Sequence, residues 1–527
     1  MMFSASHLGP TVANHVPMTP LDMLDRTVAE QPEAVAILWG DERITWAEFD
    51  AMVQRFAGRL RDLGVGKGDV VSVIAGNIPE MLAAHFAVPT LGAVLNAINT
   101  RLDPETVQFI VRHCEAKVLI TDAARADLGR ASDTLPVHVF GQGFDILTGR
   151  VPDRIDWRGV VTEDWQPIAL NYTSGTTGNP KGVVLHHRGA YMNALGNADA
   201  LGFDRDTVYL WTLPLFHCNG WCHGWAVTSA GGTHVCLDGV DPSQVYDAMD
   251  AHGVTNFFCA PVVLYMLLDH PDRVKRSEGS RPVKVGTGGA APTSSLIERM
   301  DALAFDLSHL YGLTECYGPA TVNHLPQNLR GAEAGVRAKY LASQGKRHTT
   351  ACVLKVFDEA DQEVPHDGET TGEIVLRGNT LMAGYLKNPD ATAEALRDGW
   401  FRTGDLGVVL PDGRLMIKDR AKDIIITGGE NVSSIEVEDV LHRCEAVALA
   451  AVVAAPHEKW GETPCAFVEL RDGGTIEQVE EHCRQYLAGF KRPRYFVPRA
   501  IPKTATGKVQ KFILRQEAKA QFGGGEA

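Results

Sequence analysis

The chain has 527 residues, of which 65 are Asp or Glu and 50 are Lys or Arg, so its formal net charge is −15. This acidic balance argues against sequence-independent binding to nucleic acid or to an anionic membrane surface. Hydrophobic residues make up 45% and charged residues 22% of the chain, as in typical globular proteins, and the length predicts about two to four lobes rather than one core.

The N-terminal segment does not have the pattern of a secretory signal. Its first 20 residues lack a basic segment followed by an apolar run, which is the mark of a secretory signal. The most apolar stretch, residues 81–98, contains a His and a Pro and falls short of the roughly 20 apolar residues that cross a bilayer. We therefore expect no membrane span, and a buried helix and turn at 81–98. Ten scattered cysteines favour reduced thiols in the cytoplasm.

An α/β body is predicted for the first half of the chain. Residues 18–280 alternate helical patterns with short apolar runs at 70–74, 117–120 and 254–258. Strands that alternate with helices predict parallel sheets.

A β-rich segment follows the α/β body. Strand-like runs at 351–358, 372–378 and 414–420 are separated by turns that contain Asp and Gly. Close-spaced strands with such turns predict an antiparallel barrel or a small sheet.

Residues 419–423, DRAKD, form a charged interruption before the apolar run at 424–426. Beyond it, Ser433 with Glu436 three residues later predicts a capping box that opens a helix. Strands are expected at 451–453 and 465–470. We predict a large domain at 1–418, a hinge at 419–423 and a small α+β domain at 424–527.

The segment 172–182, YTSGTTGNPKG, is typical of a phosphate-binding loop. Glycines let backbone N–H groups approach an anion closely, hydroxyls donate further hydrogen bonds and Lys181 adds a point charge. The alternative is a surface turn rich in Gly and Ser. A Walker A loop is excluded, because Pro180 stands where its second Gly would be and Gly182 follows Lys181.

A second run, 217–223, places His217, Cys218, Cys222 and His223 within seven residues. This composition suits zinc, but a structural zinc site commonly draws paired ligands from two separate clusters. No second cluster with matching spacing occurs, so a zinc site is disfavoured.

The phosphate-loop segment resembles the signature of the adenylate-forming superfamily, which contains acyl-CoA synthetases, luciferases and nonribosomal adenylation domains. Further segments resemble that superfamily in the same order: 286–292 (GTGGAAP), 311–315 (YGLTE), 403–405 (TGD), 419–431 (DRAKDIIITGGEN) and 502–511 (PKTATGKVQK). The resemblance spans about residues 20–520. It implies a large N-terminal domain of two α/β layered subdomains plus a small β-barrel, followed by a small mobile α+β C-terminal domain.

The resemblance also implies how ATP and Mg²⁺ bind. The phosphates would be held by Thr173, Ser174, Gly175, Thr176, Thr177, Gly178 and Lys181. Adenine would be held by Gly288, Gly289, Ala290, Tyr311 and Gly312. Thr314 would bond the α-phosphate, and Glu315 would hold the metal ion. Asp405 would accept the ribose hydroxyls, and Arg420 would reach the nucleotide near the hinge.

Catalysis is implied to depend on Lys508, whose ammonium would bridge the incoming carboxylate and the α-phosphate. Lys422 is the implied hinge residue, where many members have Asp, and Asp419 stands where many have Gly. This departure leaves the balance between the two domain orientations open.

The acyl pocket of the superfamily is built partly after a Pro-x-x-His run, here at 214–217, which implies roles for His217, Trp221 and Gly312. Acetyl-CoA synthetases carry a Trp where this chain has Gly312, so acids larger than acetate are expected. Coenzyme A is implied to pass Gly428 and Gly429 and to stack on Trp460.

The sequence is therefore interpreted as an acyl-CoA synthetase for a short- or medium-chain carboxylic acid, in the branch that contains medium-chain fatty acid and 3-(methylthio)propionate CoA ligases. ATP, Mg²⁺, CoA and the acid are the expected small-molecule partners, and a homodimer is left open. Alternatives are a ligase for aryl or phenylpropenoid acids, a stand-alone enzyme that loads a carrier protein, and a non-catalytic nucleotide sensor.

Overall fold

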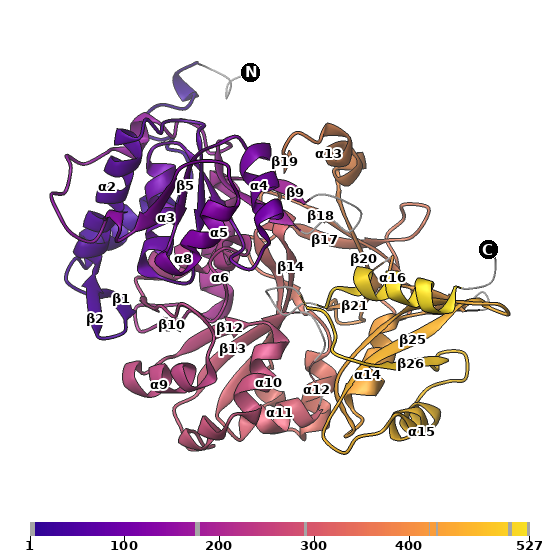
Figure 1. Cartoon of the computed structure of the whole chain (residues 1–527). Helices are drawn as coiled ribbons and strands as arrows, with labels where there is room; N and C mark the ends of the chain where they lie inside the picture. The colour runs from indigo at the N-terminus through magenta and orange to yellow at the C-terminus, as the bar shows by residue number, and fades with distance from the viewer. Residues whose placement is uncertain are drawn as a thin grey trace.

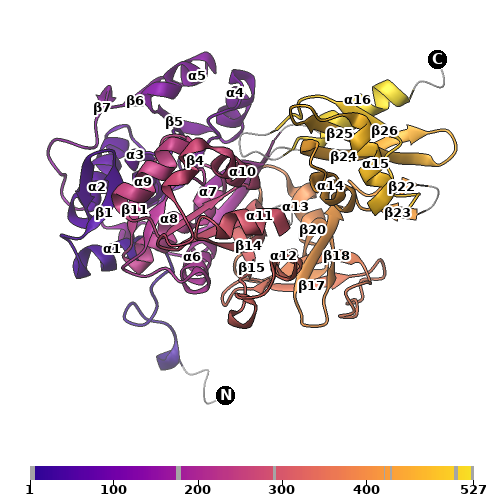
Figure 2. The ribbon, with the colours of Figure 1, turned by 90° about the horizontal axis from the view of Figure 1, so that it is seen from below.

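The computed structural model describes residues 6–173, 180–288, 292, 294–420, 422–427, 430–503 and 509–523. Figure 1 shows a large body made from the first four-fifths of the chain and a C-terminal lobe, coloured yellow, beside it. Three sheets belong to the body and one sheet to the lobe. Seen from below in Figure 2, the lobe lies at one side of the body.

The first sheet has eight strands in the order β19-β9-β8-β4-β3-β5-β6-β7. Its strands are β3 (Val70–Ile74), β4 (Val94–Ala97), β5 (Ala116–Thr121), β6 (Val137–Phe140), β7 (Gly143–Phe144), β8 (Pro167–Thr173), β9 (Lys181–His186) and β19 (Gly384–Tyr385). Strands β3 to β8 are parallel, whereas β9 and β19 are antiparallel to their neighbours. The parallel sheet predicted from the runs at 70–74 and 117–120 is confirmed.

The second sheet has nine strands in the order β16-β15-β14-β13-β12-β10-β11-β1-β2. Its strands are β1 (Val35–Trp39), β2 (Glu42–Thr45), β10 (Val208–Leu210), β11 (Thr233–Val235), β12 (Asn256–Cys259), β13 (Val283–Gly288), β14 (Phe305–Leu313), β15 (Gly318–Asn323) and β16 (Lys346–Arg347). The central strands are parallel, and β14 turns back antiparallel into β15.

Helices cover and separate these sheets (Figure 1). They are α1 (Pro20–Glu30), α2 (Trp46–Asp62), α3 (Pro79–Thr90), α4 (Pro104–His113), α5 (Ala126–Ala131), α6 (His187–Leu201), α7 (Cys218–Trp221), α8 (His223–Ala230), α9 (Pro242–His252), α10 (Pro261–Asp269), α11 (Ser294–Asp301), α12 (Ala334–Leu341) and α13 (Pro389–Ala395). The largest core joins α1, α2, α3, α6 and α8 to residues of both sheets. Because α3 lies in this core, it is buried on every side except at Glu80, as the apolar stretch at 81–98 predicted.

Short 3₁₀ helices connect several of these elements. They are η2 (Ser6–Leu8), η3 (Ala123–Arg125), η4 (Trp157–Gly159), η5 (Pro271–Lys275), η6 (Thr314–Cys316), η7 (Gln327–Leu329) and η8 (Arg397–Gly399).

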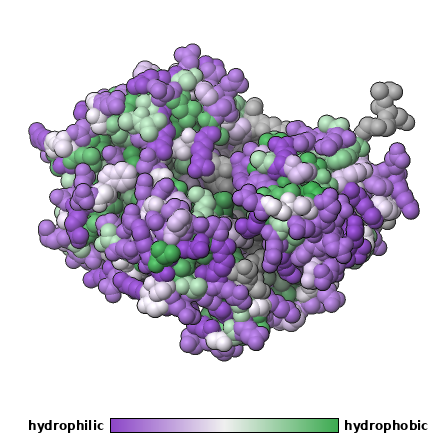
Figure 3. All heavy atoms as spheres, turned by 60° about the horizontal axis from the view of Figure 1, so that its bottom comes forward, coloured by the Kyte–Doolittle hydropathy of each residue, from purple (hydrophilic) through white to green (hydrophobic). Residues whose placement is uncertain are grey.

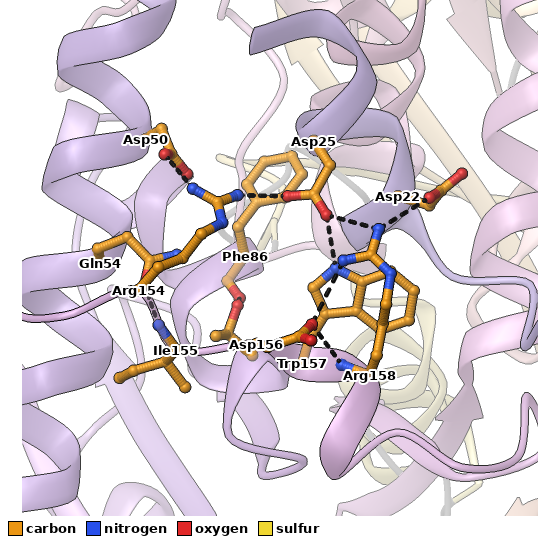
Figure 4. Close-up of polar contacts among 11 residues, drawn as sticks. Asp22, Asp25, Asp50, Gln54, Phe86, Arg154, Ile155, Asp156, Trp157 and Arg158 are labelled. Carbon is orange, nitrogen blue, oxygen red and sulfur yellow. Dashed lines mark hydrogen bonds and ion pairs between the residues drawn. The ribbon is translucent and has the colours of Figure 1, made fainter. Parts of the chain in front are cut away.

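The segment that contains η4 is tied to α1 and α2 by an ionic network (Figure 4). The Arg154 guanidinium lies between Asp50 at 2.6 Å and Asp25 at 2.5 Å. The other oxygen of Asp25 accepts hydrogen bonds from Arg158, at 3.0 Å, and from the Trp157 indole N–H, also at 3.0 Å. Since Asp25 lies on α1 and Asp50 on α2, one loop joins the two helices.

The third sheet is four-stranded, antiparallel and ordered β17-β18-β20-β21. Its strands are β17 (Val353–Phe357), β18 (Gly372–Arg377), β20 (Phe401–Val409) and β21 (Leu415–Arg420). The small antiparallel unit predicted after residue 350 is present. Its last strand runs through Asp419 and Arg420, so the predicted interruption at 419–423 starts inside a strand.

The C-terminal lobe has a sheet in the order β23-β22-β25-β24, and β26 pairs with β25. Its elements are β22 (Ile425–Thr427), β23 (Glu430–Val432), α14 (Ser434–His442), β24 (Val447–His457), β25 (Gly461–Leu470), α15 (Ile476–Tyr486), β26 (Tyr495–Pro498) and α16 (Lys511–Phe522). One core packs this sheet against α14 and α15, and a second packs it against α16. The mixed α+β lobe agrees with the prediction.

The predicted capping box is only half formed. Ser433 accepts the N–H of Glu436 at 3.2 Å, as an N-cap should. The Glu436 carboxylate pairs with Lys491 at 2.5 Å instead of returning to the cap.

The surface in Figure 3 is largely hydrophilic with scattered hydrophobic residues, and a hollow separates the body from the lobe on this face. Among the helices of the described ranges, none combines the length and the apolar character that a membrane crossing requires.

Candidate active site

Several of the predicted nucleotide residues meet where β14, β20 and β21 come together. The Tyr311 hydroxyl donates to Asp405 Oδ2 at 2.7 Å, and Arg420 Nε lies 3.3 Å from Asp405 Oδ1. Asp405 and Arg420 are direct partners in the β20–β21 ladder. Tyr311 and Asp405 are only 8% and 5% exposed. The structure thus joins three residues that lie far apart in the sequence into one hydrogen-bonded group.

The Asp405 carboxylate can accept more hydrogen bonds beyond the contacts that it makes here, as binding of ribose hydroxyls would require. Each carboxylate oxygen has two lone pairs, so Asp405 keeps the capacity to accept further hydrogen bonds while bound to Tyr311 and Arg420. Burial, and then the Asp405 charge, raises the pKa of Tyr311 far above its usual value, so its hydroxyl stays a donor.

A second group surrounds Glu315 in the turn after β14. Its Oε1 accepts the hydroxyl of Tyr385 at 3.0 Å, and its carbonyl accepts the N–H of Met382 at 2.7 Å. The Lys181 ammonium lies 4.9 Å from the centre of the Tyr385 ring. Burial raises the pKa of Glu315, and the Tyr385 hydrogen bond opposes that rise. Tyr385 was missed by the sequence analysis, which singled out no motif around 384–385.

The donor set around Glu315 fits a magnesium ion. Mg²⁺ usually takes one or two protein carboxylates and completes its shell with water and substrate phosphates. Glu315 supplies such a carboxylate, and β9 begins nearby at Lys181, paired with Thr173 in the β8–β9 ladder.

Thr314 contacts the loop that carries His217. Its Oγ1 lies 3.1 Å from Cys218 Sγ, which in turn lies 3.9 Å from His217 Nε2. The predicted α-phosphate and acyl residues are therefore adjacent.

The loop itself has an unusual backbone. Five consecutive residues adopt the left-handed conformation, with φ of 47°, 51°, 60°, 57° and 62° from Cys218 to Cys222. Only one of them, Gly220, is a glycine, and the others carry a conformational cost of order 1–2 kcal/mol each. Such strain persists only where surrounding contacts determine the backbone.

Those contacts come from buried asparagines. The Asn171 amide donates to the carbonyl of Phe216 at 3.3 Å and accepts from Asn219 at 3.0 Å. The Asn197 amide donates to the carbonyl of Trp221 at 2.9 Å. Asn171 precedes the 172–182 segment on β8, so this network couples that segment to the loop that carries His217 and Trp221.

Trp221 lies beside the predicted adenine segment. A Cβ added to Gly288 would lie 3.7 Å from the Trp221 indole, and one added to Gly318 would lie 3.0 Å from the Trp221 Cβ. The indole is half-buried between β13 and β15.

Gly312 lies where β14 approaches β15 closely. A Cβ at this position would lie 1.7 Å from the Gly318 carbonyl oxygen and 2.9 Å from Pro319 Cα. Glycine is needed here because β14 and β15 cross closely at an irregular register between Tyr311 and Gly312. The contact with β15 therefore requires glycine at 312, and the adenine and acyl-pocket roles of Gly312 stay predictions.

Three of the four side chains in the 217–223 run contact different partners. Cys218 contacts Thr314, Cys222 donates to the carbonyl of Tyr317 at 3.4 Å, and His223 Nδ1 lies 2.8 Å from the hydroxyl of Tyr209. Across the described ranges, no group of three or more His, Cys, Asp or Glu is arranged to hold a metal ion.

Trp460 lies in the turn between β24 and β25 of the lobe. Its ring stacks on His457 at 4.3 Å, and the Arg494 guanidinium lies 4.7 Å from it. An aromatic surface with basic neighbours suits a nucleotide.

A cavity of about 240 Å³ lies elsewhere, at the opposite end of β13. It is lined by Lys284, Asp306 and His324, none of which belongs to the groups above.

The remaining predicted residues lie outside the described ranges: Ser174, Gly175, Thr176, Thr177, Gly178, Gly289, Ala290, Gly428, Gly429 and Lys508. Lys422 is described and lies in an exposed turn after β21.

Comparison with known proteins gives two family matches. Residues 24–386 match the model of the AMP-binding enzyme family, and residues 436–508 match that of the AMP-binding enzyme C-terminal domain.

Curated relatives match along nearly all of their length. A peroxisomal butyrate–CoA ligase of Arabidopsis thaliana is 42% identical, with 96% of this chain and 94% of the relative covered. A peroxisomal acetate/butyrate–CoA ligase of the same plant is 41% identical, with 96% and 95% covered.

Solved structures of o-succinylbenzoate CoA synthetase from Bacillus subtilis are also similar. The complex with the acyl-adenylate intermediate has a TM-score of 0.81 and 28% identity, and covers 93% of this chain and 97% of that chain. The complex with ATP and magnesium has a TM-score of 0.80 and 27% identity, and covers 94% and 99%.

Proposed function

The chain belongs to the family of AMP-binding enzymes and is an AMP-forming acyl-CoA ligase, and we propose that its substrate is a short-chain, uncharged monocarboxylic acid. Its co-substrates are ATP and CoA, with Mg²⁺ as the metal ion. A carboxylate oxygen bonds to the α-phosphorus and pyrophosphate leaves. The deprotonated CoA thiol then attacks the acyl carbonyl, and AMP leaves.

The position of Trp221 carries the substrate proposal. Its indole lies against Gly288, beside the segment assigned to adenine, and would close the acyl pocket a short distance from the reacting carboxylate. The two plant relatives, named as a butyrate–CoA ligase and an acetate/butyrate–CoA ligase, favour the same size range. We assign His217 and Trp221 to this pocket. Longer chains would have to displace the indole.

The nucleotide is assigned to the two groups around Asp405 and Glu315. Asp405 would accept the ribose hydroxyls, while Tyr311 and Gly288 face adenine and Arg420 adds positive charge. Thr314 and the phosphate-loop residues 173–178 with Lys181 would orient the phosphates. Mg²⁺, held by Glu315, would neutralise part of the phosphate charge as two anions meet.

Lys508 is the proposed catalytic lysine, because its ammonium would neutralise the incoming carboxylate and the α-phosphate together. We propose a large domain at 1–418, a hinge at 419–423 centred on Lys422, and a small domain at 424–527. Gly428, Gly429 and Trp460 would then approach CoA after the small domain reorients.

Location and assembly are also proposals. All ten cysteines are buried, which suits a reducing compartment such as the cytoplasm, although the two relatives are named peroxisomal. A homodimer is testable by size-exclusion chromatography with light scattering.

The test is a panel of acids assayed for CoA-dependent AMP release. It should include linear acids from acetate to octanoate, 2-methylpropanoate, 3-(methylthio)propionate, benzoate and 4-coumarate. The proposal expects the highest kcat/KM between propionate and pentanoate. Preference for octanoate or an aromatic acid would overturn it, and adenylate formation without CoA turnover would indicate loading of a carrier protein.

A further inference from the structure

One tyrosine stands between the lysine of the phosphate loop and the carboxylate assigned to the metal. The Tyr385 hydroxyl donates to Glu315 Oε1 at 3.0 Å, while the Lys181 ammonium lies 4.9 Å from the centre of the same ring. The two ends of a single rigid side chain thus contact two opposite charges.

The backbone around Tyr385 is fixed to both neighbours. Met382 N–H donates to the carbonyl of Glu315 at 2.7 Å, and Leu386 N–H donates to the carbonyl of Gly182, next to Lys181, at 2.8 Å. Tyr385 itself pairs with Val183 in the β9–β19 ladder. The ring position is therefore set by main-chain hydrogen bonds on either side, and not by the ring contacts alone.

A direct ion pair would be the alternative arrangement for these charges. Of the ion pairs between described residues, none joins Lys181 to Glu315. If Glu315 and Lys181 formed an ion pair, that pair would have to break before Glu315 could hold a metal ion. It would also have to break before Lys181 could bind a phosphate. The aromatic face offers Lys181 a weak attraction, and the attraction of an ATP phosphate for the ammonium is stronger.

We propose that Tyr385 is a positioning residue that holds Glu315 for Mg²⁺ and keeps Lys181 available for the ATP phosphates, an inference that rests on the proposed function of both residues. The Tyr385 hydroxyl binds Oε1 of Glu315 and so orients the carboxylate, and it makes no hydrogen bond to Oε2. The ring separates the ammonium from that carboxylate until nucleotide arrives. Tyr385 acts through these two side chains and has no assigned contact with the reacting atoms.

The test measures ATP binding by calorimetry, without carboxylic acid, in the presence of Mg²⁺ and again with EDTA. Tyr385→Phe keeps the ring and removes the hydroxyl, so it should weaken binding about 3- to 10-fold with Mg²⁺ and leave binding with EDTA unchanged. Tyr385→Leu also removes the aromatic face, so it should weaken binding under both conditions. The Mg²⁺ concentration for half-maximal adenylation should rise in both variants.

Two controls separate positioning from general damage. Tyr486→Phe removes a hydroxyl from a tyrosine that is 58% exposed on α15 and should change neither affinity. In a Glu315→Gln background, adding Tyr385→Phe should have no further effect on Mg²⁺ dependence, because the carboxylate it orients is gone.

The outcomes are distinct. Equal weakening by Tyr385→Phe with Mg²⁺ and with EDTA, or an additive effect in the Glu315→Gln background, would overturn the positioning role. Thermal unfolding of each variant identifies losses that come from misfolding, and a Tyr385→Phe protein that does not fold would also overturn it. If the unmodified protein bound ATP without any gain from Mg²⁺, the proposed role of Glu315 would itself be wrong.

Discussion

Asp419 Oδ2 accepts the backbone N–H of Ser434 at 2.6 Å, so the end of β21 is joined to the first residue of α14. Its Oδ1 accepts the N–H of Arg420 at 2.7 Å, and the Ser433 hydroxyl donates to the carbonyl of Lys418 at 2.5 Å. Asp419 is 1% exposed. These bonds cross the proposed hinge and stabilise the orientation seen in Figure 1.

Asp419→Asn should loosen this junction. An amide presents an NH₂ to one of the two backbone N–H groups, so one hydrogen bond to a charged acceptor is lost at a cost of about 1.5–3 kcal/mol. Urea unfolding should show that loss, and the ratio of adenylation to thioester formation should change. Asp412→Asn is the matched control, since Asp412 is exposed in the β20–β21 turn and pairs with Arg414. Equal stability of the two variants would contradict the role of Asp419.

Lys508→Ala should abolish the first half-reaction and spare the second. The ammonium is needed where the carboxylate meets the α-phosphate, and removal of one preorganised contact of this kind costs about 10²-fold or more. Pyrophosphate release measures adenylation, and acyl-CoA formation from supplied acyl-adenylate measures transfer. Lys503→Ala, at an exposed lysine that pairs with Glu469, should affect neither. Equal losses in both half-reactions would refute the assignment.

Gly312→Ala should destabilise the protein and leave its acyl-chain preference unchanged. The new methyl group would overlap the Gly318 carbonyl, so β15 would have to shift. The free energy of unfolding should fall by about 1–3 kcal/mol. Thermal unfolding measures the effect. Gly331→Ala is the control, because its Cβ would have nothing within 4 Å. A variant with normal stability and a shorter acyl preference would support the pocket interpretation.

The sequence predicted the sheets well because their signals are local. The runs at 70–74 and 117–120 became neighbouring strands β3 and β5, since short apolar runs between helices have few other ways to be buried. The turn residues after 350 likewise marked antiparallel strands.

Features that depend on distant partners could not be predicted. The crowding at Gly312 comes from Gly318 across a tight turn, and the contact of Tyr385 with Glu315 spans 70 residues. The left-handed turn at Cys218–Trp221 is unfavourable for its own residues, and buried asparagines from other elements stabilise it. Local propensity carries no information about such support.

Stability should fall as the pH is lowered from about 6.5 towards 4. Burial lowers the pKa of six histidines to about 3 or 4: His85, His186, His187, His223, His234 and His442. Because their pKa in the unfolded chain is higher, the unfolded state binds more protons in this window, and each group contributes up to about 1.4 kcal/mol per pH unit. Urea unfolding at pH 7.5, 6.0 and 5.0 measures the slope.

One of these histidines gives a matched variant. His442 Nε2 accepts the N–H of Ala450 at 3.0 Å, and a protonated ring would lose that bond. His442→Gln keeps an acceptor and removes the titrating group. The change in the free energy of unfolding per pH unit should therefore be smaller, by the contribution of about one proton. Equal stability of the unmodified protein at pH 7.5 and 5.0 would show that the buried rings do not limit acid tolerance.

Trp221→Leu should extend the range of acids towards longer chains. The indole lies against Gly288, and a smaller side chain would free volume beyond the carbonyl of a short acyl group. Each methylene accommodated is worth about 1–3 kcal/mol, and hexanoate has two more methylenes than butyrate, so kcat/KM for hexanoate should rise at least about 30-fold relative to butyrate. The measurement is CoA-dependent AMP release along the series from acetate to octanoate. Trp165→Leu is the control, because Trp165 is 50% exposed and stacks on His186, away from the pocket. A folded, active Trp221→Leu enzyme with an unchanged length profile would show that another residue closes the acyl site.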